Sequence, residues 1–132
     1  MERILVDSSV WIDFFNNVEN RQTGILTDLL INESSICTCP VILQEVLQGI
    51  MDDKHFYRVK ADLETFDLLQ VQPLEGALEA VNLYRSLRKK GITIRRSNDC
   101  LIAHYAIFHK AFVLHKDRDF TFIAQHTDLQ LL

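Results

Sequence analysis

The segment ILVDSSVWID, residues 4–13, places a carboxylate where a short apolar run ends. Residues 4–6 are apolar and rich in β-branched side chains, which is typical of a buried strand. Asp7 follows at once, and the pattern turns helical between Val10 and Phe15. One Asp after one strand is weak evidence for a site, so its meaning depends on whether other carboxylates reach the same place.

The rest of the chain alternates short apolar strands with longer helices. Strands are predicted at 3–6, 34–38, 68–71, 111–114 and 129–131. Helices are predicted at 10–15, 25–30, 40–49, 53–67, 77–87 and 99–109. This alternation predicts an α/β domain whose mainly parallel sheet is covered on both faces.

Composition indicates one ordinary globular domain over residues 1–132, with 48% apolar and 24% charged residues. The net charge of −4 argues against a passive nucleic-acid coat, which is normally basic. The chain has no signal-peptide layout and no apolar run of membrane-spanning length, so we expect a cytoplasmic protein without a membrane partner. The three cysteines have no zinc-site spacing and are expected to be reduced.

Three further carboxylates match Asp7 in kind. Asp117 also follows a predicted strand, Asp99 lies in the first turn of the helix SNDCLIAHYA, and Glu45 lies in the otherwise apolar helix PVILQEVLQG. In a parallel sheet the strands end at one edge, where the following helices begin, so we expect these carboxylates to approach one another. Gathered carboxylates raise each other's pKa unless cations such as Mg²⁺ or Mn²⁺ neutralise them. Metals held this way bind phosphodiesters and activate water.

Each carboxylate also has a purely structural interpretation. Asp7 suits a helix cap and Asp99 complements a helix dipole. Asp117 suits the turn KDRD, and Glu45 suits a solvated helix face.

A basic strip precedes Asp99. Residues 85–96 hold six Lys or Arg side chains and no acid. Such a strip beside an acidic pocket favours phosphate contacts, which we assign to Arg95 and Arg96. The alternative is a solvated helix end whose cations complement the helix dipole.

Four segments, in this order and at this spacing, resemble the PIN domain and, more narrowly, the VapC-type toxins of bacterial toxin–antitoxin pairs. They are ILVDSSVWID, PVILQEVLQG, GITIRRSNDCLIAHYA and VLHKDRDF. The resemblance implies a three-layer α/β/α fold with about five strands and an acidic pocket that binds Mg²⁺ or Mn²⁺. It implies endoribonuclease activity on structured RNA such as tRNA or rRNA, leaving a 5′-phosphate and a 3′-hydroxyl. It also implies a homodimer and a cognate antitoxin whose tail blocks the pocket.

The resemblance further assigns roles by position. The metal ligands and catalytic residues would be Asp7, Glu45, Asp99 and Asp117. Ser9 matches the small polar position that supports the first Asp through metal-bound water.

Two positions close to the fourth acid are less well defined by the resemblance. Asp119 is an auxiliary carboxylate, which points away from Asp117 if the segment stays extended. His115 stands where the family often has a small hydroxyl residue, and we expect it to be a core or edge histidine.

Three other classes of protein share part of this pattern. A haloacid-dehalogenase-like phosphatase needs a second Asp at the position of Ser9, and a response-regulator receiver needs an acidic pair near the end of the first strand. Neither pattern is evident. A catalytically inactive PIN-like scaffold that binds RNA or protein stays open, and loss of activity on chelation distinguishes the nuclease from it.

Overall fold

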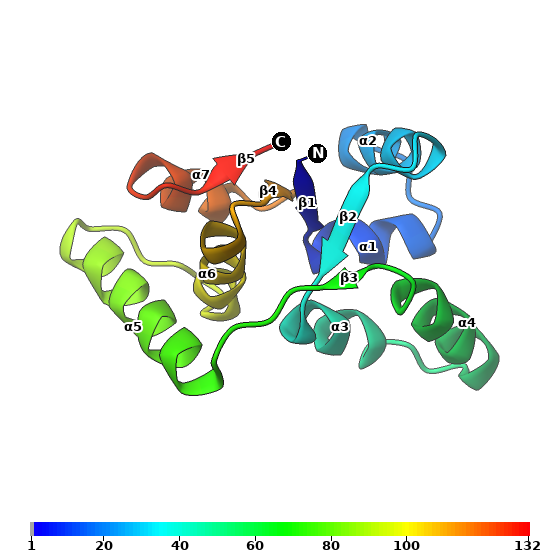
Figure 1. Ribbon diagram of the computed structural model, residues 1–132, viewed down its shortest axis with the longest axis horizontal. Coiled ribbons are helices and arrows are strands. Elements are labelled where there is room, and N and C mark those ends of the chain that lie inside the picture. The colour runs from blue at the N-terminus through cyan, green and yellow to red at the C-terminus, as the bar shows by residue number, and fades with distance from the viewer. Residues whose placement is uncertain (1) are drawn as a thin grey trace.

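The computed structural model describes residues 2–132, which form five strands and seven helices (Figure 1). The strands are β1 (Arg3–Val6), β2 (Ser35–Thr38), β3 (Asp67–Leu68), β4 (Phe112–Leu114) and β5 (Gln130–Leu131). The helices are α1 (Ser8–Phe15), α2 (Arg21–Ile31), α3 (Pro40–Leu47), α4 (Asp53–Leu63), α5 (Pro73–Lys89), α6 (Asn98–His109) and α7 (Arg118–Gln125). The strands pair in parallel in the order β3-β2-β1-β4-β5, with helices on both sides, which confirms the predicted α/β class.

Strand β1 lies at the centre of the sheet. It pairs with β2 on one side and β4 on the other, so that Leu5 stands opposite Cys37 and Val113. The ladder continues one residue beyond the strand, because the backbone N–H of Asp7 donates to the carbonyl oxygen of Leu114 at 2.9 Å. Asp7 therefore leaves the sheet at the middle of its carboxyl edge.

The helices begin where local chemistry favours them. Asn20 and Thr23 form a reciprocal capping box at the start of α2, and Pro40 and Pro73 occupy first-turn positions of α3 and α5. Helix α5 packs along α6 and lies at the left of Figure 1, while α2 and α4 lie at the right and α3 lies below the strands. Among residues 2–132, no helix combines the length and apolar character needed to cross a bilayer.

The main differences from the predicted pattern lie in α4, β3 and α7. Helix α4 ends at Leu63, and the next strand begins at Asp67 because residues 67 and 68 pair with Cys37 and Thr38. Helix α7 was not predicted, since KDRD suits a turn and the helix that follows is short. Its signals are Asp117, which caps it, and the apolar positions Phe120 and Ile123 on one face.

The cysteines are buried free thiols within the described chain. Burial raises the pKa of Cys39 to about 12 and that of Cys100 to about 11. These thiols stay protonated near neutral pH and behave as small core side chains.

Two helix-interior glycines predict opposite effects of an added methyl group. A Cβ on Gly76 would lie 2.7 Å from Cγ2 of Val71, whereas a Cβ on Gly24 meets no described atom within 4 Å. We expect Gly24→Ala to raise the free energy of unfolding by about 0.5–1 kcal/mol through helix propensity. Gly76→Ala should lower it by about 1 kcal/mol, because the clash outweighs the same gain. Urea unfolding of both variants checks this, and equal changes would contradict it.

Candidate active site

Asp7 is fully buried and uses its two carboxylate oxygens differently. Oδ2 accepts hydrogen bonds from the backbone N–H of Ser9 at 3.2 Å and from the Ser9 hydroxyl at 2.5 Å, so Asp7 caps α1. Oδ1 is also buried and has no hydrogen-bond partner within residues 2–132. The cap and the site are therefore compatible, since one oxygen serves the helix and the other stays available to a ligand.

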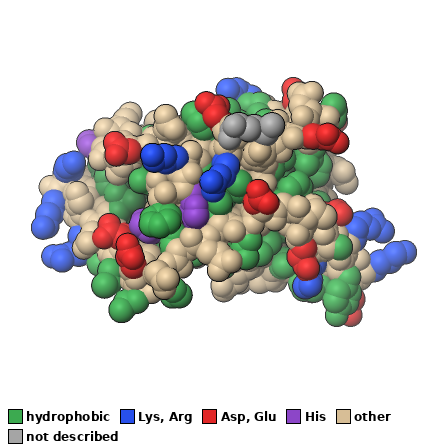
Figure 2. Space-filling model, viewed as in Figure 1, with side chains coloured by type: hydrophobic (Ala, Val, Ile, Leu, Met, Phe, Trp, Pro, Cys, Tyr) green, Lys and Arg blue, Asp and Glu red, His purple; other side chains and the backbone are tan. Residues whose placement is uncertain are grey.

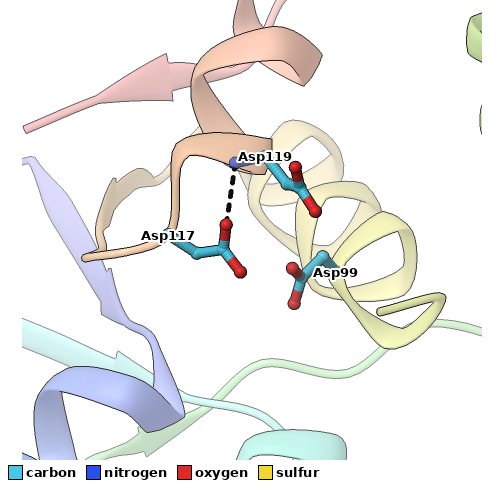
Figure 3. Close-up of side chains that lie close together, drawn as sticks. All are labelled: Asp99, Asp117 and Asp119. Atoms are coloured by element: carbon cyan, nitrogen blue, oxygen red, sulfur yellow. Dashed lines mark hydrogen bonds between the residues drawn. The ribbon is translucent and has the colours of Figure 1, made fainter. Parts of the chain in front are cut away.

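Asp99, Asp117 and Asp119 form a close group of carboxylates from two helices (Figure 3). One oxygen of each lies within 4.8 Å of the others, and in Figure 3 the side chains converge from α6 and from the start of α7. Both oxygens of Asp99 are buried without a hydrogen-bond partner in the described chain. This oxygen-rich donor set suits a hard divalent cation.

Asp119 lies toward Asp117, whereas we expected it to point away. The chain enters α7 at Arg118, and Oδ1 of Asp117 accepts the backbone N–H of Asp119 at 2.9 Å. This N-cap hydrogen bond turns the side chain of Asp117 toward the first turn of α7, where Asp119 lies. The expected orientation was therefore wrong, and it does not hold for an extended segment either, because residues i and i+2 share one face of a strand.

Glu45 approaches the same edge from α3. It is half-buried, and its Oε1 accepts a hydrogen bond from the hydroxyl of Ser8 at 3.0 Å. Asp7 and Glu45 lie outside the closest group of three, yet their charges contribute to raising the pKa of Asp99. Ser8 was not identified from the sequence, because a buried hydroxyl beside another serine leaves no pattern in the chain.

The pKa values of Asp99, the inner carboxylate, and Asp117, the outer carboxylate, are shifted in opposite directions. Burial raises the pKa of Asp99 to about 7, although the charge of Arg96 acts to lower it. The charges of the neighbouring acids Asp7, Asp117 and Glu45 add to the increase. Burial also acts on Asp117, but the backbone N–H of Asp119 and the charges of Arg96 and Arg95 outweigh it and lower the pKa of Asp117. The outer carboxylate is thus ionised at neutral pH, while the inner one needs a cation to ionise fully.

Arg95 and Arg96 lie at the mouth of the cluster. Nη2 of Arg95 is 3.0 Å from Oδ1 of Asp117, and Nη2 of Arg96 is 3.2 Å from Oδ2. With Ser9 and three neighbours they line an open pocket of about 490 Å³. Its lining residues are Ser9, Arg95, Arg96, Lys116, Asp117 and Arg118. The arginines expected to contact phosphate therefore lie against the carboxylates.

His115 and Lys116 hold the loop that carries Asp117. Nδ1 of His115 donates to the carbonyl oxygen of Asp117 at 2.8 Å, and its ring packs near Phe120, with 5.4 Å between the centroids. Nζ of Lys116 lies 2.5 Å from Oδ2 of Asp13, which lowers the pKa of Asp13 and ties the loop to α1. Both contacts position the loop.

The fold and the acidic centre at its carboxyl edge define a family. The PIN domain model matches residues 4–125, so the chain belongs to the PIN domain family. Its similar relatives include the VapC ribonuclease Mb1587 of Mycobacterium bovis and the ribonuclease VapC11 of Mycobacterium tuberculosis. Each is 35% identical over 128 residues, covering 96% of both chains.

Solved structures with the same fold include VapBC2 and VapBC-1 from two bacteria. VapBC2 from Rickettsia felis, bound to a DNA fragment from its promoter, aligns with a TM-score of 0.76 at 17% identity, covering 98% of this chain and 97% of that one. VapBC-1 from nontypeable Haemophilus influenzae aligns with a TM-score of 0.73 at 20% identity, covering 98% and 96%. At these identities the likeness establishes the fold, which confirms the expected three-layer α/β/α arrangement.

Proposed function

We propose that this protein is a divalent-metal-dependent endoribonuclease that acts as the toxin of a toxin–antitoxin pair. The observation that carries the proposal is a set of buried carboxylate oxygens without a hydrogen-bond partner in residues 2–132, on Asp7 and Asp99. Such atoms are rare in folded proteins, and Mg²⁺ or Mn²⁺ takes oxygen ligands of this kind. The 35% identity to VapC ribonucleases supports RNA as the substrate.

The proposed ligands are Asp7, Asp99 and Asp117, with Glu45 as a further ligand or as the group that orients a water. Asp119 is the auxiliary carboxylate, because it completes the close group with Asp99 and Asp117. When bound, Mg²⁺ or Mn²⁺ would stabilise charge on the scissile phosphate and lower the pKa of a water.

The side chains around these acids prepare the site for substrate. Ser9 holds the first carboxylate through Oδ2 of Asp7, and Ser8 holds Glu45. The phosphate approaches from the mouth, where the side chain of Asp117 is 12% exposed and Arg95 and Arg96 supply positive charge. Water is the nucleophile, so no side chain of the protein has to form a covalent intermediate with the RNA.

Metal-dependent cleavage by purified protein tests the proposal. Total cellular RNA is incubated with Mg²⁺, Mn²⁺ or chelator, using wild type, Asp7→Ala and Asp99→Ala. We expect discrete fragments with metal only, and at least a thousand-fold less cleavage in both variants. Asp53→Ala is the matched control, because Asp53 is an exposed acid in the first turn of α4.

The possible outcomes separate the two candidate functions. Cleavage that persists in folded Asp7→Ala and Asp99→Ala proteins would refute the site. Absence of metal-dependent cleavage with tRNA, rRNA and total RNA would favour the inactive scaffold.

We further propose that a cognate antitoxin controls the enzyme in the cytoplasm. The fold neighbours include VapBC complexes, which supports a protein partner of this kind. An arginine of the partner entering the carboxylate cluster would form charge-assisted hydrogen bonds.

A homodimer is proposed through the exposed face of α5. Leu74, Leu78 and Val81 recur at helical spacing and are 73%, 54% and 50% exposed. Figure 2 shows hydrophobic side chains at the lower left, where α5 begins, and Lys and Arg at the far left, where it ends. A contiguous apolar stripe of this kind favours a protein contact.

Leu78→Lys should convert the dimer to a monomer, because a charge would be buried in the contact. Ile31→Lys is the matched control, since Ile31 is 72% exposed on α2. Sedimentation velocity at micromolar concentration measures both. A Leu78→Lys protein that still sediments as a dimer would rule out this face.

A further inference from the structure

The segment between α5 and α6 is attached to the acidic cluster through its backbone as well as its side chains. The backbone N–H of Arg95 donates to Oδ2 of Asp119 at 3.0 Å. Nη2 of the same residue is 3.0 Å from Oδ1 of Asp117, its Nε is 3.5 Å from Oδ2 of Asp119, and its side chain is 61% exposed. The backbone bond does not depend on the side chain, so the guanidinium can leave Asp117 while the segment stays in place.

Arg96 bridges the inner and outer carboxylates. Its Nη2 is 3.2 Å from Oδ2 of Asp117, and its Nε is 3.7 Å from Oδ2 of Asp99. The second separation exceeds hydrogen-bond range, so that contact is purely ionic. The side chain of Arg96 is 44% exposed, so its charge can be solvated by water or paired with another anion when it leaves these carboxylates.

The oxygens that face these guanidinium groups are among those proposed to hold the metal. Both oxygens of Asp117 and Oδ2 of Asp99 are involved. A divalent cation and a guanidinium group repel each other and cannot share one small set of oxygens at full strength. Metal binding and arginine pairing therefore compete.

We propose that Arg95 and Arg96 are exchangeable counter-ions of the acidic cluster, which leave the carboxylates when a divalent cation binds and then contact phosphates of the RNA backbone. This inference rests on the proposed function. Both side chains line the open pocket that also contains Lys116 and Arg118, so the released charges stay beside the cluster. Cation and RNA then bind cooperatively, and each raises the affinity for the other by the same factor.

The first test measures the affinity for Mn²⁺ alone. Isothermal titration calorimetry compares wild type with Arg95→Gln, Arg96→Gln and Arg118→Gln. Arg118→Gln is the control. Arg118 lines the same pocket and its substitution removes the same charge, yet no ion pair within the described chain joins Arg118 to the cluster. We expect three- to ten-fold tighter Mn²⁺ binding in each of the first two variants, and less than a two-fold change in the control.

The second test measures cooperativity with a phosphodiester probe that resists cleavage. Fluorescence anisotropy follows a 2′-O-methyl oligonucleotide of about twelve nucleotides, with and without Mn²⁺. We expect Mn²⁺ to tighten binding to wild type at least five-fold. The double variant Arg95→Gln/Arg96→Gln should lose most of that enhancement, while Arg118→Gln binds more weakly overall and keeps it.

Unchanged or weaker Mn²⁺ binding in folded Arg95→Gln and Arg96→Gln proteins would overturn the exchange. Circular dichroism in chelator verifies folding, and Arg→Met versions, which also remove the charge, replace any variant that fails to fold. A wild-type protein that binds no Mn²⁺ would overturn the exchange and the proposed function together. A wild type that binds Mn²⁺ and cleaves RNA, with arginine variants unaltered in both tests, would overturn the exchange alone.

Discussion

Replacing Asp99 by asparagine should abolish metal-dependent cleavage and also stabilise the metal-free protein at alkaline pH. Burial raises the pKa of Asp99 from 3.8 to about 7. This shift corresponds to a contribution of about 4 kcal/mol to the free energy of unfolding. Because the pKa is raised in the folded state, this stability is fully present below pH 4 and is lost as the pH rises through 7. Asparagine has nearly the same shape and carries no charge. The free energy of unfolding of the variant therefore does not fall with pH in this way.

Urea unfolding in chelator at several pH values measures this effect. The advantage of Asp99→Asn over wild type should grow by about 3 kcal/mol between pH 5 and pH 8. Comparing the two proteins at each pH cancels the titration of carboxylates that do not interact with Asp99. Asp53→Asn, at an exposed first-turn position, should differ from wild type by less than about 0.5 kcal/mol throughout. An Asp99→Asn advantage that does not change with pH would show that burial does not hold the proton on Asp99.

Ser9→Ala should weaken Mn²⁺ binding about 10- to 100-fold, which is typical when a residue that orients a metal ligand is removed. The Ser9 hydroxyl donates to Oδ2 of Asp7 at 2.5 Å. Without it, Oδ2 keeps only the backbone N–H at 3.2 Å and the carboxylate is free to turn. Calorimetric titration with Mn²⁺ measures the loss.

Two companion variants make the result specific. Ser9→Thr retains a hydroxyl and should restore most of the affinity. Ser8→Ala should cost less than about ten-fold, because Ser8 holds the half-buried Glu45 rather than the buried Asp7. Wild-type Mn²⁺ affinity in Ser9→Ala would mean that the hydroxyl does not position the first carboxylate.

The central part of the fold was predictable because its strands are short, buried and followed directly by polar residues. Ile4 to Val6 form such a strand, and its carboxylate, Asp7, marks the edge. The parallel-sheet rule then predicted that Asp99 and Asp117 would approach each other, which they do. These inferences depend on periodicity and chain direction, and both are visible in one sequence.

The remaining features depend on contacts between distant segments. A strand was predicted at 68–71, but β3 spans only Asp67 and Leu68, because these two residues pair with β2. Helix α7 was missed because its first residues also suit a turn. The pairing of Arg95 with Asp117 spans 22 residues, so the basic strip alone did not reveal that its end faces inward.

The sheet has very short edge strands on both sides, and this limits how the protein meets other chains. Strands β3 and β5 contain two residues each. An edge this short presents few free backbone N–H and carbonyl groups, so it is a poor template for an added strand and resists edge-to-edge aggregation. We therefore expect contacts with other chains to depend on side chains of the helix faces and of the acidic edge rather than on strand pairing.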